Sequence, residues 1–462
     1  MSIADAPASP VPTPVQSCWR RFCQLMAAIF YRRREFAGLE NLPASGPVVL
    51  CANHVNALVD GVVVQASCPR PIHPLARSGL FRNPLLRPLL KGIQAIPIYR
   101  RRPGQDKASA ANEDSFRRCY EYLGEGRVIL IFPEGQSHSD PMLRPLKTGA
   151  ARMALGLHEL RGVLPSVVPV GLTFPDKGRF RGELLVQYGL PVPLAVQPGE
   201  APEETIRRFT SAIEEGLASV TLNVDSWEDL ELMRLLQRFF LLRDSRREDA
   251  PPSKSLSARF RSLHQLAETH RWLRLRHPDP VRLLREKLRR FERLCRRYGV
   301  RDYHLQLRYD PRLVTRFVVR SQAFVLFVFP LALWGVANSA LPYLATRAMT
   351  RATARGRDQY DSAGMIFGLL FFLAFWGAQT LAVWWRWGLP GAFAYGLSLP
   401  VTGAVALLVG KERKRILDEV RIFVLFLRKR GLREYLKVRR QELEVEVASL
   451  ARLARQGPAA AG

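Results

Sequence analysis

Cysteine is scarce in this chain, and its distribution excludes two classes of protein. The six cysteines among 462 residues include no CxxC pair; they are Cys18, Cys23, Cys51, Cys68, Cys119 and Cys295. Scattered cysteines of this kind indicate neither a zinc site nor a disulfide framework. A reducing, cytosolic environment fits them best.

The first 17 residues lack the basic start and apolar core of a signal peptide. We expect them to form a disordered tail. Residues 18–36 follow with a short apolar run between arginine pairs, too short to span a bilayer. This pattern predicts an amphipathic helix at the membrane interface with its arginines on lipid phosphates, and an ordinary packing helix is the alternative.

Acidic residues are few relative to basic ones: 41 Asp and Glu against 69 Lys and Arg, a formal net charge of +28. Such an excess favours a polyanionic partner, either nucleic acid or an anionic membrane. Most of the basic residues are arginines, whose forked guanidinium matches phosphate. The abundance of arginine and alanine also suggests a GC-rich bacterial genome.

Residues 37–223 have the pattern of an α/β domain. Short Val-, Ile- and Leu-rich runs bounded by Gly, Pro or Asn predict buried strands, namely GPVVLCAN, GIQAIPIY, RVILIFPEG and LPSVVPVGLTF. Helical patterns lie between them, at residues 112–124 and 148–160. Alternation of strands and helices predicts a layered α/β fold.

Residues 224–315 are predicted to be a basic helical subdomain with Leu and Phe stripes. Its basic face suits anionic lipid, and a solvated helical insert is the alternative. Residues 316–410 then contain three apolar runs of membrane-spanning length, 322–345, 364–385 and 389–409. Residues 411–462 complete the chain as a basic helix and tail.

The basic segments on both sides of the apolar runs should lie on the cytoplasmic face. That arrangement requires an even number of crossings from three apolar runs, so one run is expected to be re-entrant or interfacial. Trp384, Trp385 and Trp387 resemble an interfacial aromatic belt. We therefore expect an integral membrane protein of the bacterial inner membrane with its α/β domain on the cytoplasmic face.

The sharpest chemical signal is CANHVNALVDG, which puts His54 and Asp60 at a strand-to-helix junction. A neutral imidazole can take the proton of a hydroxyl as that hydroxyl attacks a thioester. A carboxylate on the other ring nitrogen would fix the tautomer and stabilise the imidazolium. A purely structural pair is the alternative reading of these two residues.

A second signal is IFPEGQSHSD, where a strand ends in a turn containing Glu134 and Gly135. Glycine allows a ligand to approach the backbone closely. Backbone N–H groups, the Ser137 hydroxyl and His138 would hold a phosphate or hydroxyl groups there. The alternatives are a capped turn without a ligand, and His138 as a surface residue.

Three further residues extend the candidate site. Lys147 precedes a predicted helix, whose N-terminus is a suitable anion site. Arg100 opens an arginine triplet at the end of a strand, a placement that suits a phosphate monoester, or else the triplet is a solvated basic loop. Pro169 shapes the VVPVGLTF strand, which would line an apolar acyl groove.

Together and in this order, these four blocks resemble the phospholipid/glycerol acyltransferase family. Its pattern is an Asn-His…Asp motif, a strand ending in Arg, Phe-Pro-Glu-Gly, and a Val-Pro-Val-Gly-like strand. The similarity covers roughly residues 38–193. It implies an acyltransferase domain with a central mixed sheet flanked by helices, here followed by basic and membrane-spanning helices.

The details resemble the fungal-type branch of glycerol-3-phosphate/dihydroxyacetone-phosphate acyltransferases. HVNALVD has five residues between His and Asp where four are common, and the FPEGxSH form and the long C-terminal extension also match that branch. Gln136 and Ser139 depart from the expected Gly and Asp, which bears on the choice of acceptor. For the longer spacing, His54 must lie before the first helical turn, because one extra residue rotates a helix by about 100°.

The resemblance implies a role for each matching residue. His54 would be the general base and Asp60 its orienting partner. Arg100 would bind the acceptor phosphate, Glu134 and Gly135 would help to bind the acceptor, and Pro169 would belong to the acyl-donor strand. No cofactor is expected, since the thioester of acyl-CoA or acyl carrier protein drives the transfer.

The leading hypothesis is acylation of glycerol 3-phosphate or dihydroxyacetone phosphate in phospholipid biosynthesis. Acylation of lysophosphatidate to phosphatidate is the alternative within the same class. A lipid-binding protein with a degenerate acyltransferase domain is a third reading, and the intact motif residues oppose it. A nucleic-acid binder is disfavoured by the three apolar runs. The sequence leaves the oligomeric state open.

Overall fold

The computed structural model describes residues 11–84, 86–99, 107–244, 255–301, 304–305 and 311–454. The chain forms two compact units. The first comprises residues up to 229 together with residues 255–264 and 354–365. The second comprises residues 230–244, 265–353 and 366–454, apart from those that are not described.

The first unit is built on a seven-stranded sheet in the order β1-β7-β6-β2-β5-β3-β4. Neighbouring strands are parallel except for the antiparallel β6–β7 pair. The mixed sheet expected from the family resemblance is thus confirmed. The strands are β1 (Tyr31–Ala37), β2 (Val48–Ala52), β3 (Ile72–Arg77), β4 (Ile96–Ile98), β5 (Val128–Ile131), β6 (Ser166–Thr173) and β7 (Gly182–Tyr188).

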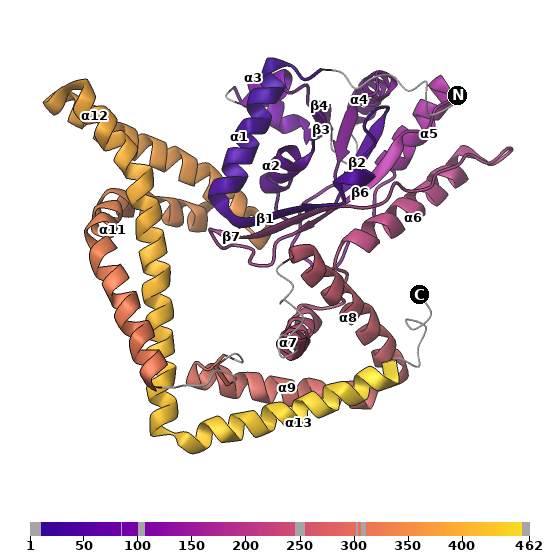
Figure 1. Ribbon diagram of the computed structural model, residues 1–462. Coiled ribbons are helices and arrows are strands. Elements are labelled where there is room, and N and C mark those ends of the chain that lie inside the picture. Colours follow the sequence, from indigo (N-terminus) through magenta and orange to yellow (C-terminus); the bar gives the residue numbers. More distant parts are fainter. Residues whose placement is uncertain are drawn as a thin grey trace. The chain divides into compact units, whose positions relative to one another are not determined.

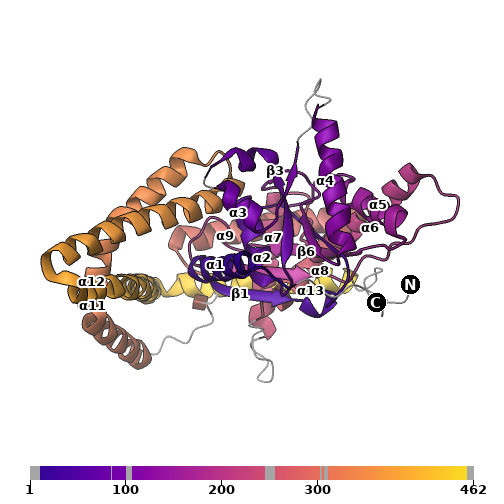
Figure 2. The same cartoon turned by 90° about the horizontal axis from the view of Figure 1, so that it is seen from above.

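Helices cover both faces of this sheet. Figure 1 and Figure 2 show α1 and α2 on one side, and α4, α5 and α6 on the other. Short 3-10 turns lie at Leu39–Asn41 and Ser78–Arg82. The helices of this layer are α1 (Pro14–Phe30), α2 (Leu58–Ser67), α3 (Leu86–Gly92), α4 (Lys107–Gly124), α5 (Gly149–Arg161) and α6 (Pro202–Val220).

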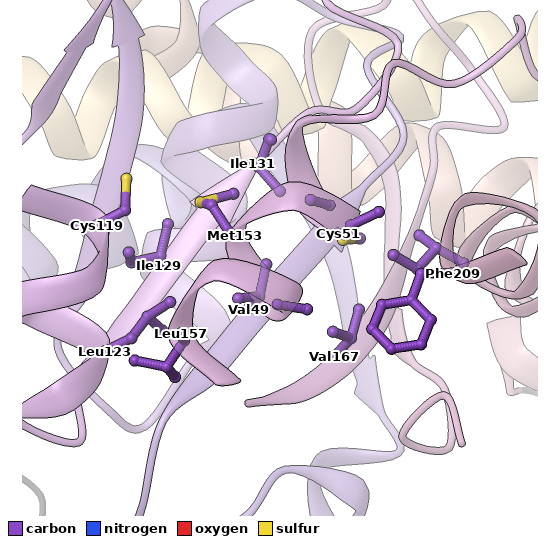
Figure 3. Close-up of a cluster of buried hydrophobic side chains, with 14 of the residues drawn as sticks. Val49, Cys51, Cys119, Leu123, Ile129, Ile131, Met153, Leu157, Val167 and Phe209 are labelled. Carbon is purple, nitrogen blue, oxygen red and sulfur yellow. The ribbon is translucent and has the colours of Figure 1, made fainter. Parts of the chain in front are cut away.

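The central strands β2 and β5 are apolar on both faces because both faces are covered. Every residue of β2 is buried. Val49, Ile129 and Val167 lie in one cluster with Met153 of α5 and Phe209 of α6 (Figure 3). Burying an aliphatic or aromatic side chain of this size contributes about 1.5–3 kcal/mol, so this cluster fixes α5 and α6 against the sheet.

The order of the strands determines where a site can form. β2 lies between β5 and β6 and pairs in parallel with both. The chain runs from β2 to β3 on one side of it and places β6 on the other. In open α/β sheets, ligands bind outside the carboxyl ends of the strands at such a switch point. The loops after β2, β5 and β6 therefore converge at one edge of the sheet.

The remaining helices carry the basic and apolar segments. They are α7 (Trp227–Asp244), α8 (Leu256–Arg276), α9 (Pro278–Tyr298), α11 (Pro311–Thr353), α12 (Arg357–Arg428) and α13 (Arg430–Ala454). In the second unit, α9 packs against α13.

The apolar stripe of α9 is buried at Val281, Leu284, Leu288, Phe291 and Cys295, which leaves the arginines of α9 on the opposite face.

Within the described residues, two helices are long and apolar enough to cross a membrane, Leu326–Thr353 and Arg357–Arg428. The longer one is interrupted at Gly388, whose φ of 71° and ψ of −174° are not helical. The predicted run 322–345 lies in α11, and the other two runs lie in α12 on either side of Gly388. Gln379 of α12 donates to the carbonyl of Asn338 in α11 (3.4 Å), and the two helices lie side by side in both ribbon views.

Candidate active site

His54 and Asp60 lie together at the carboxyl edge of the sheet. His54 Nδ1 and Asp60 Oδ2 are 2.9 Å apart. Asp60 is fully buried, while the His54 side chain is 19% exposed. The carboxylate is thus shielded from water and the imidazole reaches the surface, as a base that must meet a substrate requires.

The turn between β2 and α2, residues 53–57, achieves this pairing and is named the catalytic turn after its predicted role. His54 lies four residues before α2 begins, so it precedes the first helical turn, as the five-residue spacing requires. The Asn56 N–H donates to Asp60 Oδ2 (2.6 Å). Ala57 has a φ of 46°, a strained value for a residue with a side chain. The backbone strain of this turn therefore lies at Ala57.

Opposing effects act on the Asp60 carboxyl. Burial raises the pKa of Asp60 above its ordinary value. The hydrogen bond and charge of His54, the Asn56 N–H and the Lys177 ammonium act in the opposite direction and favour the carboxylate. The attraction between a buried carboxylate and a neighbouring imidazolium is strong, because little water screens the two charges.

The imidazole ring is fixed on its other sides too. It stacks on Phe132, with ring centroids 4.2 Å apart and planes at 19°. The His54 backbone N–H donates to Glu134 Oε1 (2.7 Å), and its carbonyl accepts from the His138 N–H (3.0 Å). Among the described residues nothing hydrogen-bonds to Nε2, which leaves this nitrogen to receive a proton.

Glu134 is buried and faces the protein. Its Oε1 accepts from the His54 N–H, and its Oε2 accepts from the Arg144 N–H (3.1 Å) and contacts His138 Nε2. His138 is buried as well, and its Nδ1 accepts from the Asp140 N–H (3.1 Å). Glu134 and His138 thus join the loop after β5 to the turn that carries His54.

Gly135, Ser137 and Lys147 are nearer the surface. Gly135 has a φ of +74°, which favours glycine. A Cβ at this position would lie 2.5 Å from Lys147 Nζ, so the lysine side chain packs against the glycine. The Lys147 N–H donates to the carbonyl of Pro133 (2.8 Å), just ahead of α5. Ser137 Oγ donates to Asp358 Oδ2 (2.6 Å).

Two further residues were predicted for the site, Pro169 and Arg100. Pro169 is buried within β6, and its ring lies where a side chain at Gly189 or Gly216 would meet it. Its placement therefore fits packing against α6. Arg100 lies outside the described residues, and its role stays a prediction.

Sequence reasoning missed several residues of the site. Asn53 exchanges two hydrogen bonds with the backbone of Leu172, 3.2 and 2.7 Å, and so ties the end of β2 to β6. Lys177, after β6, donates to Ser139 Oγ (2.9 Å) and to the carbonyl of Val55. Burial lowers the pKa of Lys177, an effect that Asp60, Asp358 and Asp361 oppose. The Asn directly before the His was the only available signal.

A distant segment also reaches the catalytic turn. Asn56 Nδ2 donates to Asp361 Oδ2 (2.7 Å), a residue 305 positions away. Ser362 Oγ donates to the carbonyl of Asn56 (2.9 Å) and accepts from the Val59 N–H (3.3 Å). Asp361 and Ser362 are in the first turns of α12, in a stretch of the first unit, residues 354–365, that the sequence assigned to the membrane region.

This arrangement can perform general-base chemistry on a hydroxyl. A ring nitrogen is accessible, the other nitrogen is held by a carboxylate, and the turn carrying both is fixed by hydrogen bonds from three parts of the chain. Among the described residues, no group of three or more His, Cys, Asp and Glu side chains is placed to hold a metal ion.

Comparison with known proteins gives a family match over the same part of the chain. Residues 33–173 match the family model described as Acyltransferase. This range contains the catalytic turn, the loop after β5 and most of β6.

Two relatives show what the sequence resembles. Over 134 residues the chain is 32% identical to glycerol-3-phosphate O-acyltransferase 2 of Saccharomyces cerevisiae, covering 28% of this chain and 18% of that protein. Over 192 residues it is 28% identical to the 1-acyl-sn-glycerol-3-phosphate acyltransferase of Bacillus subtilis, covering 40% of this chain and 87% of that protein. The chain thus spans less than a fifth of the yeast relative.

Among solved structures, the chain is similar to the 1-acyl-sn-glycerophosphate acyltransferase of Thermotoga maritima. The TM-score is 0.34 at 20% identity, with 44% of this chain and 78% of that chain covered.

Proposed function

We propose that this chain is a membrane-bound glycerolipid O-acyltransferase, because residues 33–173 match the family model described as Acyltransferase. Its acceptor is glycerol 3-phosphate or dihydroxyacetone phosphate, and its donor is acyl-CoA or acyl carrier protein. The 2.9 Å contact between His54 Nδ1 and Asp60 Oδ2 carries the proposal, since it leaves Nε2 for the acceptor hydroxyl. The acceptor follows from the likeness to yeast glycerol-3-phosphate O-acyltransferases.

The reaction proceeds by addition and elimination. His54 Nε2 takes the hydroxyl proton as the oxygen attacks the thioester carbonyl carbon. Asp60 stabilises the imidazolium that forms, as a buried carboxylate does in triads. The carbon–sulfur bond then breaks, the leaving thiolate takes the proton from the imidazolium, and the ester is released. The thioester supplies the driving force, so we propose that no cofactor takes part.

Two residues are proposed to receive the acceptor phosphate. The side chain of Lys147 is exposed beside Gly135, ahead of α5, where a cation and a helix N-terminus both favour an anion. Arg100 completes the phosphate site in this proposal. Glu134 and His138 are proposed to act indirectly, by holding the turn that carries His54 in place.

Lysophosphatidate is the second candidate acceptor. The observation in its favour is the Bacillus subtilis relative, a 1-acyl-sn-glycerol-3-phosphate acyltransferase that the chain matches over 87% of its length. The two candidates differ in the acyl chain that the acceptor already carries.

To test this, the full chain in detergent is given each candidate acceptor together with acyl-CoA, and the release of free thiol is measured. We expect turnover with glycerol 3-phosphate or dihydroxyacetone phosphate and none in His54→Ala, with unchanged membrane association. His158→Ala, on α5 outside the site, is the matched control and should retain full activity. Turnover with lysophosphatidate alone would select the second candidate. Activity on none of the three acceptors, or retained turnover in His54→Ala, would refute the assignment.

The membrane and its lipids are proposed as partners. Exposed arginines cover one face of α9, opposite its buried stripe: Arg282, Arg289, Arg290, Arg293, Arg296 and Arg297. Basic helices of this kind bind anionic headgroups. We place the catalytic domain on the cytoplasmic face of a bacterial inner membrane.

A further inference from the structure

Lys177 lies in the loop between β6 and β7, residues 174–181, and its ammonium contacts two other loops. Nζ donates to Ser139 Oγ (2.9 Å) and to the carbonyl of Val55. Ser139 belongs to the loop after β5, and Val55 directly follows His54 in the catalytic turn. One ammonium thus joins the loops after β2, β5 and β6 at the edge of the sheet where His54 lies.

The Val55–Asn56 peptide group connects Lys177 to Asp60. Its carbonyl accepts from Lys177 Nζ, and its N–H donates to Asp60 Oδ2 (2.6 Å). The same carboxylate oxygen lies 2.9 Å from His54 Nδ1. Because a peptide group is planar, a cation that is held at the carbonyl fixes the direction of the N–H and strengthens it as a donor. A chain of hydrogen bonds therefore runs from the ammonium to the imidazole.

Charge as well as hydrogen bonding links Lys177 to the buried carboxylate. Burial lowers the pKa of the Lys177 ammonium, and the carboxylates of Asp60, Asp358 and Asp361 oppose this effect. Burial likewise raises the pKa of Asp60, and the charge of Lys177 is among the effects that oppose it. Each group thus favours the charged form of the other, and the interaction is weakly screened because Asp60 is fully buried.

Other charged and titratable groups around Lys177 and the His54–Asp60 pair come from β1, the loop after β5 and the first turns of α12. They are Tyr31, Glu134, His138, Arg357, Asp358 and Asp361. Arg357 is the other permanent cation in this group, and its side chain is exposed to screening by water. Lys177 is therefore the cation that acts on the Asp60 carboxylate.

We propose that Lys177 is a positioning residue, which holds Asp60 charged and aligned with His54 through the intervening peptide group. Its bond to Ser139 keeps the loop after β5 against the catalytic turn at the same time. Lys177 meets no substrate in this role, so its loss acts on kcat and on the pH dependence of turnover and leaves KM unchanged. The effect on turnover rests on the proposed function, whereas the effect on the turn does not.

The first test compares the full chain in detergent with Lys177→Met, which removes the charge and the donors of the side chain, and with Lys177→Arg, which keeps both. The acceptor is one that the unaltered chain acylates. We expect Lys177→Met to lower kcat about tenfold or more at an unchanged KM for acyl-CoA, as loss of a charge-assisted hydrogen bond does. Lys177→Arg should recover most of kcat. Arg179→Gln, in the same loop and 68% exposed, is the matched control and should be fully active.

The pH dependence separates the charge of Lys177 from its packing. A nearby cation disfavours the binding of a proton to the His54–Asp60 pair, so without it the pair is protonated at higher pH. The acid limb of kcat/KM should therefore move to higher pH in Lys177→Met. It should keep its position in Lys177→Arg and in Arg179→Gln. A residue that only packed against the turn would leave the limb where it is.

Hydrogen exchange measures the catalytic turn without any turnover. The Asn56 amide donates to Asp60, so peptides that cover residues 53–60 should exchange about tenfold faster in Lys177→Met. Peptides of β2 and β5 should keep their protection, and Arg179→Gln should exchange as the unaltered chain does. If β2 and β5 lose protection as well, Lys177→Gln replaces Lys177→Met, since it keeps a donor and removes only the charge.

Unchanged exchange of residues 53–60 without the Lys177 charge would overturn this proposal. An active enzyme whose kcat and acid limb are indifferent to Lys177→Met would overturn it as well. If the unaltered chain acylates none of the candidate acceptors, the proposed function fails, and the exchange measurement alone decides whether Lys177 holds the turn.

Discussion

At the scale of single residues, the site combines one accessible base with buried groups that hold it. His54 meets the surface, and Asp60 and Glu134 are shielded from it. Glu134 accepts from the backbone of His54 and of Arg144, so its two oxygens are already committed to protein groups. In the proposed mechanism the carboxylates position the imidazole and the imidazole meets the substrate.

Asp60→Asn tests the orienting role. The substitution keeps the size of the side chain but removes the negative charge that stabilises the imidazolium. We expect kcat to fall about 10³-fold with little change in KM, because the missing interaction strengthens only as the proton is transferred. Steady-state thiol release measures both constants. A loss confined to KM would show that Asp60 binds the substrate instead.

At the scale of elements, the catalytic turn depends on a segment that is remote in sequence. Residues 354–365 comprise the link after α11 and the first turns of α12, and Asp361 and Ser362 there bind both ends of the 56–59 turn. The same segment reaches the loop after β5 through Asp358 and Ser137. The start of an apolar helix is thereby tied to the chemistry of the first unit.

Ser362→Ala removes both hydrogen bonds that this hydroxyl makes to the turn. Each is worth about 0.5–1.5 kcal/mol, so we expect kcat to fall roughly tenfold with an unchanged KM for the donor. Thr353→Ala is the matched control, since that hydroxyl bonds only within α11 and is exposed. Equal kinetics in the two variants would argue against a positioning role for the segment.

The start of α8 is held by a carboxylate from β1. Burial opposes ionisation of Glu35, but hydrogen bonds from Ser255, Ser257 and the Leu256 N–H outweigh it and lower the pKa of Glu35 to about 2. Its folded pKa is below the ordinary value of 4.5, so the stabilisation is present above about pH 4.5 and is lost as the pH falls towards 2.

Hydrogen exchange of residues 256–260 should therefore become faster between pH 5 and about pH 2 than intrinsic rates predict. Glu35→Gln should show the faster exchange already at pH 7. Glu40→Gln, exposed in the 3-10 turn that follows β1, should exchange as the unaltered chain does. If the hydrogen-exchange protection of residues 256–260 in the unaltered chain did not change with pH, this account would be contradicted.

At the scale of the whole molecule, the first unit carries the chemistry and the long apolar helices associate the chain with a membrane. Large apolar side chains are exposed along α12, among them Leu373, Trp385 and Phe393. Exposed apolar surface over helices of spanning length is stable in lipid and costly in water. The five-part division of the chain and the number of crossings stay predictions.

Extraction of the protein from isolated membranes tests this association. We expect the full chain to stay in the membrane fraction in 1 M salt and at carbonate pH, and to be released by detergent. At 1 M salt, interactions between charges more than about 3 Å apart are largely screened. High salt would therefore release a protein that is held to the membrane only by its basic helices. Release by salt would therefore assign the attachment to α9 and the other basic segments.

Much of this protein could be predicted from its sequence. The family resemblance and the layered α/β domain are confirmed, because strand and helix periodicities are local and four motifs occur in order. The pairing of His54 with Asp60 was predictable for the same reason, since both residues lie within one turn and its helix. The substrate roles of Arg100, Ser137, Lys147 and the other predicted residues stay predictions.

Other features were decided by the tertiary structure alone. Asp361 and Ser362 fall in the predicted transmembrane region, residues 316–410, between two of its apolar runs, yet they hydrogen-bond to the turn after β2. Glu134 has the motif position of a substrate-binding residue, and only the fold shows that both of its carboxylate oxygens face protein groups. Each of these depends on which distant segments pack together, and that choice is made by burial over the whole fold, which no local periodicity records.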